Sequence, residues 1–504
     1  MEAISMWMGG LQVALRPENI LFAFIGCVLG TWIGVLPGIG PAAGTAILIP
    51  VTFGLDPVPA IMMLCAIYYG SQYGGTITSV LVNVPGESST VVTCFDGYPM
   101  AKQGRAGTAL GIAAIGSFVG GTLSTIGVMI LALPLARLAL RFGPPEIFAL
   151  VVLGITMVVG LTGKRFIPAL LMMCFGLVLA LVGQDPVRGD PRFAFNIAEL
   201  YDGLDFVPVV MGLFGISEVI LSIEEPAGEV LETKLSSLIP SKQEWKAASG
   251  AIARGTILGF FMGLVPGISS VIPTFVSYVV EKAVAKQPER FGKGAIEGVA
   301  GPETANNAYS QSAMIPLLTL GLPGSPTLAV IMGAFLINGI TPGPLLFRDR
   351  PDLVWGLIAS FYVGNVILLI LNLPLVGLWA RLLEIPYQYL YSGVLLFCFV
   401  GAYSVRQSTF DVGVAVLFGV LGYIFRKLDW PMAPIILALV LGPMAEKSLR
   451  TSLEMSGGDF GIFLNRPISA VLLASGLLVL LGSALHEPVR RWIKRRTSIP
   501  PNVA

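Results

Sequence analysis

Long apolar runs alternate with short polar segments along almost the whole chain. Many of these runs approach the roughly 20 residues with which an α-helix crosses about 30 Å of hydrocarbon. They span residues 20–36, 108–132, 147–163, 166–182, 206–223, 251–272, 353–379 and 468–485. The pattern predicts an all-α membrane protein that crosses the bilayer many times.

Two polar segments inside this apolar sequence resemble each other. Residues 83–90 read Asn-Val-Pro-Gly-Glu-Ser-Ser-Thr and residues 321–327 read Gly-Leu-Pro-Gly-Ser-Pro-Thr, so each has a Pro-Gly step followed by small hydroxyl residues. Their first prolines, Pro85 and Pro323, are 238 residues apart (323 − 85). Proline and glycine interrupt helices, so both segments are predicted breaks.

Three further landmarks recur in the same order. A Pro-Gly-Ile step at residues 37–39 returns at residues 266–268, and the polar stretch at residues 68–75 has a counterpart at residues 303–310. Asp96-Gly97 is matched by Asn338-Gly339. The chain is therefore predicted to contain a duplication, with a binding site where the two copies meet.

The positions of Lys and Arg orient the two copies, because short cytoplasmic loops are enriched in both residues. Basic residues at 102–105, 164–165, 234–246, 426–427 and 490–496 are predicted to be cytoplasmic. The copies are then two inverted-topology repeats of about five transmembrane helices each, with broken or re-entrant Pro-Gly segments, plus a C-terminal helix. Arg348 and Arg350 fall on the opposite side, beside Asp349 and Asp352.

This reading divides the chain into five parts. They are an N-terminal lead-in at 1–19, a first repeat at 20–224, a cytoplasmic linker at 225–250, a second repeat at 251–446, and a final helix with a basic cytoplasmic tail at 447–504. The lead-in has neither a basic region nor a cleavage site, so an amphipathic helix is expected there and not a signal peptide.

Composition agrees with a membrane protein. Of 504 residues, 55% are hydrophobic and 12% are charged, whereas soluble domains carry about 25% charged residues. A formal charge of +1 gives no indication of nucleic-acid binding. The five cysteines are scattered without metal-site spacing and are interpreted as small buried residues.

A helix broken at membrane depth leaves backbone N–H and C=O groups that need partners, and this is tolerated where the backbone lines a cavity. Helix N-termini and hydroxyls at such a break suit a carboxylate. The predicted substrate-binding residues are Asn83, Pro85, Gly86, Ser88, Ser89, Thr90, Gly321, Pro323, Gly324, Ser325 and Thr327. The competing interpretation of each segment is a kinked helix or a surface loop.

Carbonyl groups at the other breaks, together with polar residues inside apolar sequence, suit a cation. The predicted cation-binding residues are Pro37, Gly38, Gly40, Pro266, Gly267, Glu303, Asn306 and Asn307. The alternatives are close helix packing at the two Pro-Gly-Ile steps and a water-exposed loop at Glu303. For Glu87 the sequence leaves two alternatives, a position in a cavity or one in water. Asp96 is interpreted as a turn cap.

Covalent chemistry has no candidate residues. His486, the single histidine, stands at the basic end of the last run, and no His-Glu-x-x-His motif occurs. The sequence predicts no catalytic residues, no metal and no cofactor. Besides a coupled carrier, a passive organic-anion channel and a membrane enzyme are the functional classes to weigh.

Several of these phrases together resemble the large membrane subunit of the bacterial tripartite tricarboxylate transporters. The first-half phrases are Gly34-x-x-Pro-Gly-Ile-Gly-Pro, Tyr69-Gly-Ser-Gln-Tyr-Gly-Gly-Thr-Ile-Thr-Ser, Asn83-Val-Pro-Gly-Glu and Asp96-Gly-Tyr-Pro-Met-Ala-Lys-Gln-Gly. The second-half phrases are Gly263-Leu-Val-Pro-Gly-Ile, Pro302-Glu-Thr-Ala-Asn-Asn-Ala and Gly321-Leu-Pro-Gly-Ser-Pro-Thr. The resemblance extends over nearly the whole chain.

The resemblance implies a secondary transporter subunit in the bacterial inner membrane that imports carboxylates by alternating access, driven by a sodium or proton gradient. It implies two protein partners, a small membrane subunit and a periplasmic substrate-binding protein. The expected C-terminus is cytoplasmic. A carrier that works without a binding protein is the nearest alternative, and the sequence identifies neither the carboxylate nor the coupling ion.

Overall fold

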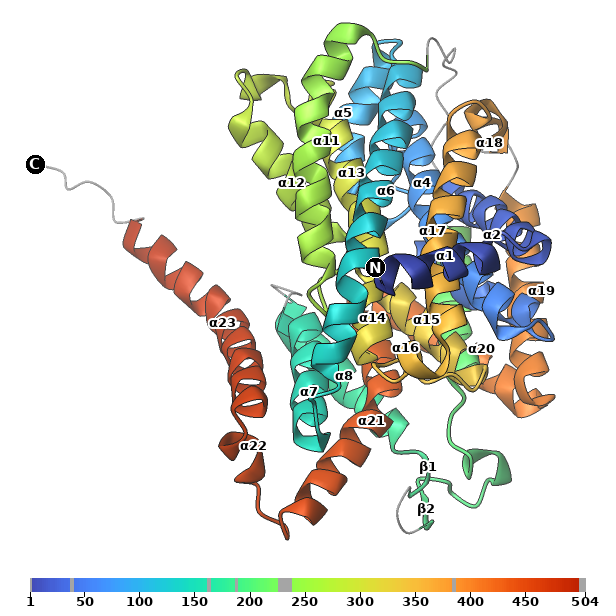
Figure 1. Ribbon diagram of the computed structural model, residues 1–504, viewed down its shortest axis with the longest axis vertical. Helices are drawn as coiled ribbons and strands as arrows, with labels where there is room; N and C mark the ends of the chain where they lie inside the picture. The colour runs from blue at the N-terminus through green and yellow to red at the C-terminus, as the bar shows by residue number, and fades with distance from the viewer. Residues whose placement is uncertain are drawn as a thin grey trace, which may run out of the picture. The chain divides into compact units, whose positions relative to one another are not determined.

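The computed structural model describes residues 2–36, 40–160, 165–185, 189–224, 238–382 and 387–497, and nearly all of its regular structure is helical (Figure 1). The elements up to the long connection are α1 (Glu2–Ala14), α2 (Pro17–Val35), α3 (Gly40–Leu48), η1 (Ile49–Thr52), α4 (Pro57–Leu81), η2 (Ser88–Thr90), α5 (Val91–Lys102), α6 (Ala106–Ala139), α7 (Pro144–Gly160), α8 (Phe166–Ala180), β1 (Gly183–Gln184), β2 (Pro191–Arg192), η4 (Ala198–Leu200), α9 (Phe206–Val210), η5 (Met211–Ile216) and α10 (Ser217–Glu224).

The later elements are α11 (Lys242–Gly263), α12 (Val271–Val284), η6 (Pro288–Arg290), α13 (Glu297–Ser312), α14 (Met314–Leu320), α15 (Pro326–Ile337), α16 (Leu346–Asp349), α17 (Pro351–Asn372), α18 (Val376–Leu382), α19 (Tyr387–Arg406), α20 (Thr409–Lys427), α21 (Ala433–Met455), α22 (Ile462–Asn465) and α23 (Pro467–Thr497).

Long apolar helices confirm the predicted membrane class. Five described segments are long and apolar enough to span a bilayer, namely α2, α6, the continuous stretch Phe206–Glu224, α17 and α20. Shorter apolar helices, including α7, α8 and α15, accompany them. The protein is therefore an all-α, multi-pass membrane protein.

The chain forms two compact units that do not coincide with the predicted repeats. Unit 1 consists of Met1–Leu140 and Asp205–Tyr423, and unit 2 of Arg141–Leu204 and Ile424–Ala504. Each unit therefore draws on both halves of the sequence. The repeat boundaries at 224, 251 and 446 stay predictions.

Two equivalent helix pairs form the centre of unit 1. In the first pair α2 packs against α4, and in the second pair α11 packs against α13 (Figure 1). A Cβ built on Gly30 would lie 2.4 Å from the Ile67 carbonyl oxygen, and one on Gly259 would lie 2.2 Å from that of Ala305. Glycine at every fourth position lets the backbones touch in both pairs. The contacting residues of the two pairs correspond with offsets of 229 (259 − 30) and 238 (305 − 67).

Contacts between the halves are reciprocal. The Gly121 backbone lies against the Asn365 side chain, and these residues occupy matching places in Phe118-Val-Gly-Gly and Tyr362-Val-Gly-Asn. Ser117 accepts a hydrogen bond from Asn307. The residues equivalent to these two are Phe361, 244 positions after Ser117, and Tyr69, 238 positions before Asn307, and their rings contact each other edge to face. Reciprocal contacts of this kind are what the predicted duplication leads one to expect, and the two-fold relation between the copies stays a prediction.

Several expectations from the sequence are wrong in detail. The run at 251–272 is not one helix, because α11 ends at Gly263 and α12 begins only at Val271. The run at 353–379 is likewise divided between α17 and α18. Proline and glycine at 266–267 terminate the first run although hydropathy continues through them.

The cysteine interpretation holds for Cys27, Cys65 and Cys398, which are buried. Cys94 is partly exposed and Cys174 is exposed, and all five are free thiols. A lipid-facing position satisfies an apolar sequence pattern as well as a protein core does, so hydropathy alone did not distinguish the two.

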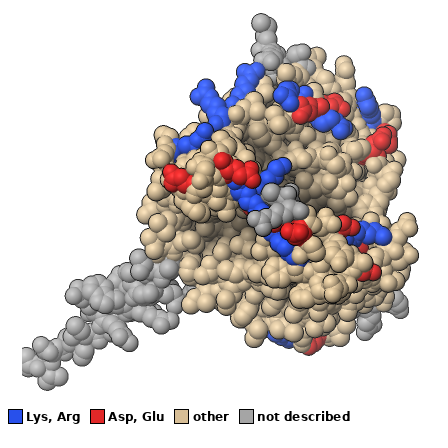
Figure 2. Space-filling view, turned by 90° about the horizontal axis from the view of Figure 1, so that it is seen from below, with Lys and Arg blue, Asp and Glu red and all other residues tan. Residues whose placement is uncertain are grey.

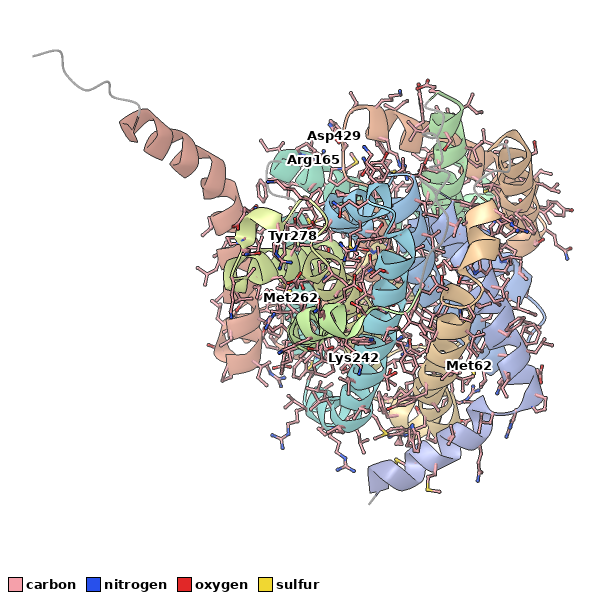
Figure 3. All side chains as sticks on the ribbon, turned by 90° about the horizontal axis from the view of Figure 1, so that it is seen from above. Met62, Arg165, Lys242, Met262, Tyr278 and Asp429 are labelled. Atoms are coloured by element: carbon pink, nitrogen blue, oxygen red, sulfur yellow. The ribbon has the colours of Figure 1, made fainter. Side chains whose placement is uncertain are left out.

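Unit 2 is tied together by charged side chains. The guanidinium of Arg192, in β2, donates to the Glu446 carboxylate of α21 at 2.8 Å, and Arg450 of α21 donates to Asp185 at 2.8 Å. Arg165 and Asp429 form a further ion pair and lie close together in Figure 3. The bonds of Arg192 and Asp185 hold the β1–β2 ribbon against α21.

Candidate functional site

The two Pro-Gly segments are breaks of the same construction. The first break comprises residues 82–87, between α4 and η2, and the second comprises residues 321–325, between α14 and α15. Each contains a left-handed residue at or next to its start, Asn83 at φ 58° and Gly321 at φ 68°, which are 238 positions apart. Asparagine and glycine are the residues that tolerate this conformation.

Each break ends at a residue that caps the following helix. In the second break, the Ser325 hydroxyl accepts the backbone N–H of Leu328 at 3.3 Å. In the first break, Glu87 occupies the equivalent position, and its backbone N–H donates to the Thr90 hydroxyl at 3.4 Å. The helices after the two breaks thus start at matching places in both halves of the sequence.

Burial divides the predicted substrate-binding residues. Gly86, Ser89, Thr90, all of residues 321–325 and Thr327 are buried, and Pro85 is partly buried. Asn83 and Ser88 are exposed. The interpretation of the second segment as a surface loop is therefore excluded, while the first segment has an exposed rim.

Gly86 is fixed in place by the first helix pair. A Cβ on this residue would lie 2.2 Å from the Gly34 carbonyl oxygen and 2.5 Å from the Gly75 Cα. At the equivalent Gly324, the nearest atoms are the Tyr309 hydroxyl at 3.5 Å and the Gly267 nitrogen at 3.9 Å. The first break thus lies against α2 and α4, the second lies near Gly267 of the Pro-Gly-Ile step at 266–268, and the first is the more tightly packed.

Glu87 joins the first break to the second half. Its Oε1 accepts from the Asn306 amide at 3.0 Å and from the neighbouring Ser89 hydroxyl. The Gln72 amide of α4 lies against the same carboxylate and Asn306. Glu87 is 6% exposed, so it faces the interior and not water.

The reciprocal contact joins the second break to the first half. The hydroxyls of Tyr68 and Tyr309 both lie beside the Ser325 hydroxyl. Tyr68 and Asn306 are equivalent residues (306 − 68 is 238), as are Glu87 and Ser325 (325 − 87 is 238). Tyr68 of α4 therefore lies at the helix cap of the second half, Ser325, and Asn306 of α13 lies at the helix cap of the first half, Glu87. These contacts bring the two breaks to one polar interior.

Glu303 forms a second buried link between the halves. Its Oε2 accepts from the Thr76 hydroxyl at 2.7 Å, and its Oε1 accepts from the Thr93 hydroxyl. Glu303 lies inside α13 and is 1% exposed, which excludes the interpretation of a water-exposed loop. The structure thus brings Glu303, Asn306 and Glu87 together across the halves.

The other predicted cation-binding residues are distributed differently. Asn307 donates to Ser117 on α6 at 2.7 Å, and its own amide oxygen is buried without a hydrogen-bond partner. Gly267 is buried at φ 84°, beside the half-buried Pro266. Gly40 starts α3 at φ 66° with open space around it. Pro37 and Gly38 lie outside the described residues.

Asp96 is not the turn cap that the sequence indicated. It lies within α5, and its Oδ1 accepts four backbone N–H groups, from Gly292, Lys293, Gly294 and Ala295, at 2.8–3.1 Å. The Tyr278 hydroxyl donates to Oδ2 at 2.9 Å. Tyr278 is labelled on α12 in Figure 3. A backbone concavity of this kind is a typical carboxylate site, and here it ties α5 to the segment before α13.

The site contains residues for which the sequence predicted no binding role. They are Tyr68, Gln72, Thr76, Thr93 and Tyr309. Two of them, Gln72 and Thr76, belong to a polar stretch of small residues within an apolar helix. Because polar side chains are costly inside a membrane, their presence there was the sequence signal for a functional role.

The outer surface carries charges of both signs in small groups. Figure 2 shows Lys and Arg interspersed with Asp and Glu on one face, with uncharged residues over most of the remainder. This face offers no extended single-sign patch of the kind that binds nucleic acid.

Comparisons with known proteins cover most of the chain. A family model described as the tripartite tricarboxylate transporter TctA family matches residues 20–437. An uncharacterized 52.8 kDa protein in the TAR-I ttuC′ 3′ region of Agrobacterium vitis is 47% identical over 478 residues, which are 95% of each chain. An uncharacterized protein in the TAR-II ttuC′ 3′ region of that organism is 48% identical over 227 residues, 45% of this chain and 94% of that protein. No solved structure matches.

Proposed function

The chain belongs to the tripartite tricarboxylate transporter TctA family, and from this premise we propose that it is the membrane subunit through which organic carboxylates enter the cytoplasm by alternating access, driven by an ion gradient. A periplasmic binding protein would deliver the substrate, and a small membrane subunit would complete the transporter. The proposed location is the bacterial inner membrane, with the C-terminus in the cytoplasm.

The observation that carries the proposal is the meeting of two equivalent helix breaks in one buried polar interior. Backbone N–H groups at the start of a helix, together with the hydroxyls of Ser89, Ser325 and Thr327, provide donors for carboxylate oxygens. Broken helices at a repeat interface are the typical substrate site of secondary transporters.

Replacing the buried hydroxyls tests this assignment. Ser325→Ala and Thr327→Ala should each lower the initial rate of carboxylate uptake about tenfold or more, because a hydrogen bond to a charged group contributes about 1.5–3 kcal/mol. Uptake of a panel of labelled di- and tricarboxylates is measured in cells with the complete transport system, and the amount of protein in the membrane is measured in parallel.

Ser88→Ala is the matched comparison for Ser89→Ala, because Ser88 is exposed and Ser89 is buried one residue away. Ser89→Ala should have the larger effect. Unaltered uptake in all the variants that lack a buried hydroxyl would contradict the assignment of the two breaks to the substrate site. Uptake that continues after the ion gradients are collapsed would instead favour a channel.

The inverted orientation of the repeats is tested by labelling. Cysteine is placed at Lys102, at the end of α5, or at the exposed Arg348, in a Cys174→Ala background that removes the exposed native thiol. A membrane-impermeant maleimide should label one site only from the cytoplasm and the other only from the periplasm. Labelling of both from the same side would contradict the inversion.

A further inference from the structure

The first break contains a buried carboxylate that belongs to the chain itself. Glu87 is 6% exposed, and its Oε1 accepts hydrogen bonds from the Asn306 amide at 3.0 Å and from the Ser89 hydroxyl. The Gln72 amide donates to the same carboxylate in the orientation that its neighbours require. Amide and hydroxyl donors from both halves of the chain therefore hold a carboxylate at this break.

The second break has corresponding hydroxyl donors and no carboxylate. Three pairs of residues are separated by 238 positions, namely Glu87 and Ser325, Ser89 and Thr327, and Tyr68 and Asn306. Thr327 is 4% exposed and Tyr68 is 2% exposed, so both are as buried as their counterparts. The side chain of Ser325 ends at its hydroxyl and brings no carboxylate. The donors are therefore retained at the second break while the acceptor is missing.

The hydroxyl of Tyr68 is a buried donor without a partner. It forms no hydrogen bond within the described part of the chain, and it lies beside the Ser325 hydroxyl. The Tyr309 hydroxyl lies there too, but it donates to the Ile268 carbonyl. A buried hydroxyl that lacks a hydrogen bond is costly, and most buried polar groups are paired. Tyr68 is thus free to donate to a ligand at the second break.

The second break also ends at the start of a helix that has no acidic residue. The helix is α15, which has 12 residues and begins at Pro326. Residues 321–337 contain neither Asp nor Glu, whereas the first break contains Glu87. The partial positive charge at a helix start stabilises an anion there. A negative charge at the start of α15 has to come from outside this segment.

The second break has room for additional atoms. A Cβ on Gly324 would have its nearest neighbour, the Tyr309 hydroxyl, at 3.5 Å, which is an ordinary van der Waals contact. A Cβ on the equivalent Gly86 would lie 2.2 Å from the Gly34 carbonyl oxygen. An atom can therefore be added beside the hydroxyls of the second break, but not at the equivalent place in the first.

We propose that a carboxylate group of the transported substrate binds at the second break, in the place that Glu87 takes at the first, and that the Tyr68 hydroxyl donates to it. The Thr327 hydroxyl and the start of α15 provide further stabilisation. This inference rests on the proposed function and makes it more specific, because it assigns the second break to the substrate and the first to a carboxylate of the chain. Since Tyr68 belongs to the first half, the bound substrate contacts both halves.

Tyr68→Phe tests the donor. The initial rate of uptake of labelled citrate, malate or succinate, measured below saturation in cells with the complete transport system, should fall about tenfold or more, because a hydrogen bond to a charged group is lost. The unfolding temperature of the purified, substrate-free chain should stay the same, because this hydroxyl has no hydrogen bond to lose. A lower unfolding temperature together with unaltered uptake would reduce Tyr68 to a structural role and overturn the proposal.

Tyr69→Phe is the matched control for this variant. Tyr69 is also 2% exposed and its hydroxyl is likewise without a hydrogen bond among the described residues, but it lies against Gly364 of α17 and not at a break. Its uptake should equal that of the wild type. An equal loss of uptake in both variants would overturn the assignment of Tyr68 to the substrate.

Ser325→Glu tests the binding place without any ligand, because it gives the second break a carboxylate like that of the first. Adding Tyr68→Phe should then lower the unfolding temperature by about 2 °C or more, since a charge-assisted hydrogen bond is lost. Ser325→Gln is the matched control, because it removes the same cap from Leu328 but brings no charge. In that background Tyr68→Phe should have roughly half the effect. The measurement is calorimetry of the purified full chain in lipid nanodiscs.

Two calorimetric outcomes would overturn the proposal. One is an unfolding temperature of Ser325→Glu that does not depend on Tyr68. The other is a Ser325→Glu variant that fails to fold while Ser325→Gln folds, since the second break would then not accept a carboxylate. If neither variant folds, the uptake of Tyr68→Phe decides.

Failure of this inference is distinguishable from failure of the proposed function. Absence of carboxylate uptake in the wild type would contradict the proposed function, and the unfolding temperatures would still decide whether the second break holds a carboxylate. Wild-type uptake that Tyr68→Phe leaves unaltered would overturn the inference and leave the proposed function in place.

Discussion

Gly86→Ala should abolish carboxylate uptake and reduce the yield of folded protein. The added Cβ would lie 2.2 Å from the Gly34 carbonyl oxygen and 2.5 Å from the Gly75 Cα, both of them backbone atoms in the first helix pair. Neither can move without separating α2 from α4. Overpacking of this kind costs about 1–3 kcal/mol, and more where backbone must shift. Uptake and the monodisperse fraction on size-exclusion chromatography are the measurements.

Two glycines provide the comparisons for this experiment. Gly324 occupies the equivalent place in the second break but has its nearest neighbour at 3.5 Å, so Gly324→Ala should fold normally. Gly413 on α20 has open space around it, and Gly413→Ala should leave both folding and uptake unchanged. Normal folding and uptake of Gly86→Ala would show that the first break does not depend on contact with α2.

The breaks were predictable from the sequence because their chemistry is local. A left-handed Asn83 or Gly321, followed by proline and glycine, ends a helix wherever it occurs. The equal spacing of Pro85 and Pro323 then made the duplication visible. The packing of α2 on α4 through Gly30 also has a sequence signal, namely glycines four residues apart. This spacing is difficult to recognise in a helix that is apolar along its whole length.

The pairings across the halves were not predictable in the same way. Tyr68 begins the polar stretch at residues 68–75, but nothing in that stretch indicates its partner, and only the folded chain brings it to Ser325. Glu87 and Asn306 are 219 positions apart, and no local rule relates them. Hydropathy also describes apolar runs without showing which helices pack together, so it does not reveal that each compact unit combines both halves of the chain.

Asp96 is the clearest case of a residue whose partners could not be predicted from the sequence. Removing its carboxylate should reduce the stability of the folded protein more than most single substitutions. Asp96→Ala removes an acceptor from the N–H groups of residues 292–295 and from the Tyr278 hydroxyl, and of the four N–H groups Lys293 keeps a bond to the Arg290 carbonyl. Breaking a buried, hydrogen-bonded charge in this way costs about 3–5 kcal/mol. We expect a lower unfolding temperature and faster hydrogen exchange at residues 292–295.

Asp96→Asn separates the charge from the geometry. The amide oxygen still accepts at the backbone concavity, but neutral hydrogen bonds are roughly half as strong as charge-assisted ones, so the loss should be intermediate. Asp349→Ala is the control, because that carboxylate is exposed and pairs with the neighbouring Arg348, and its effect should stay below about 1 kcal/mol. Hydrogen exchange at 292–295 that is the same in Asp96→Ala and wild type would show that this segment holds its conformation without the carboxylate. The carboxylate would then not be what ties α5 to the segment before α13, and packing together with the hydrogen bond from Gln103 to the Lys293 carbonyl would join them.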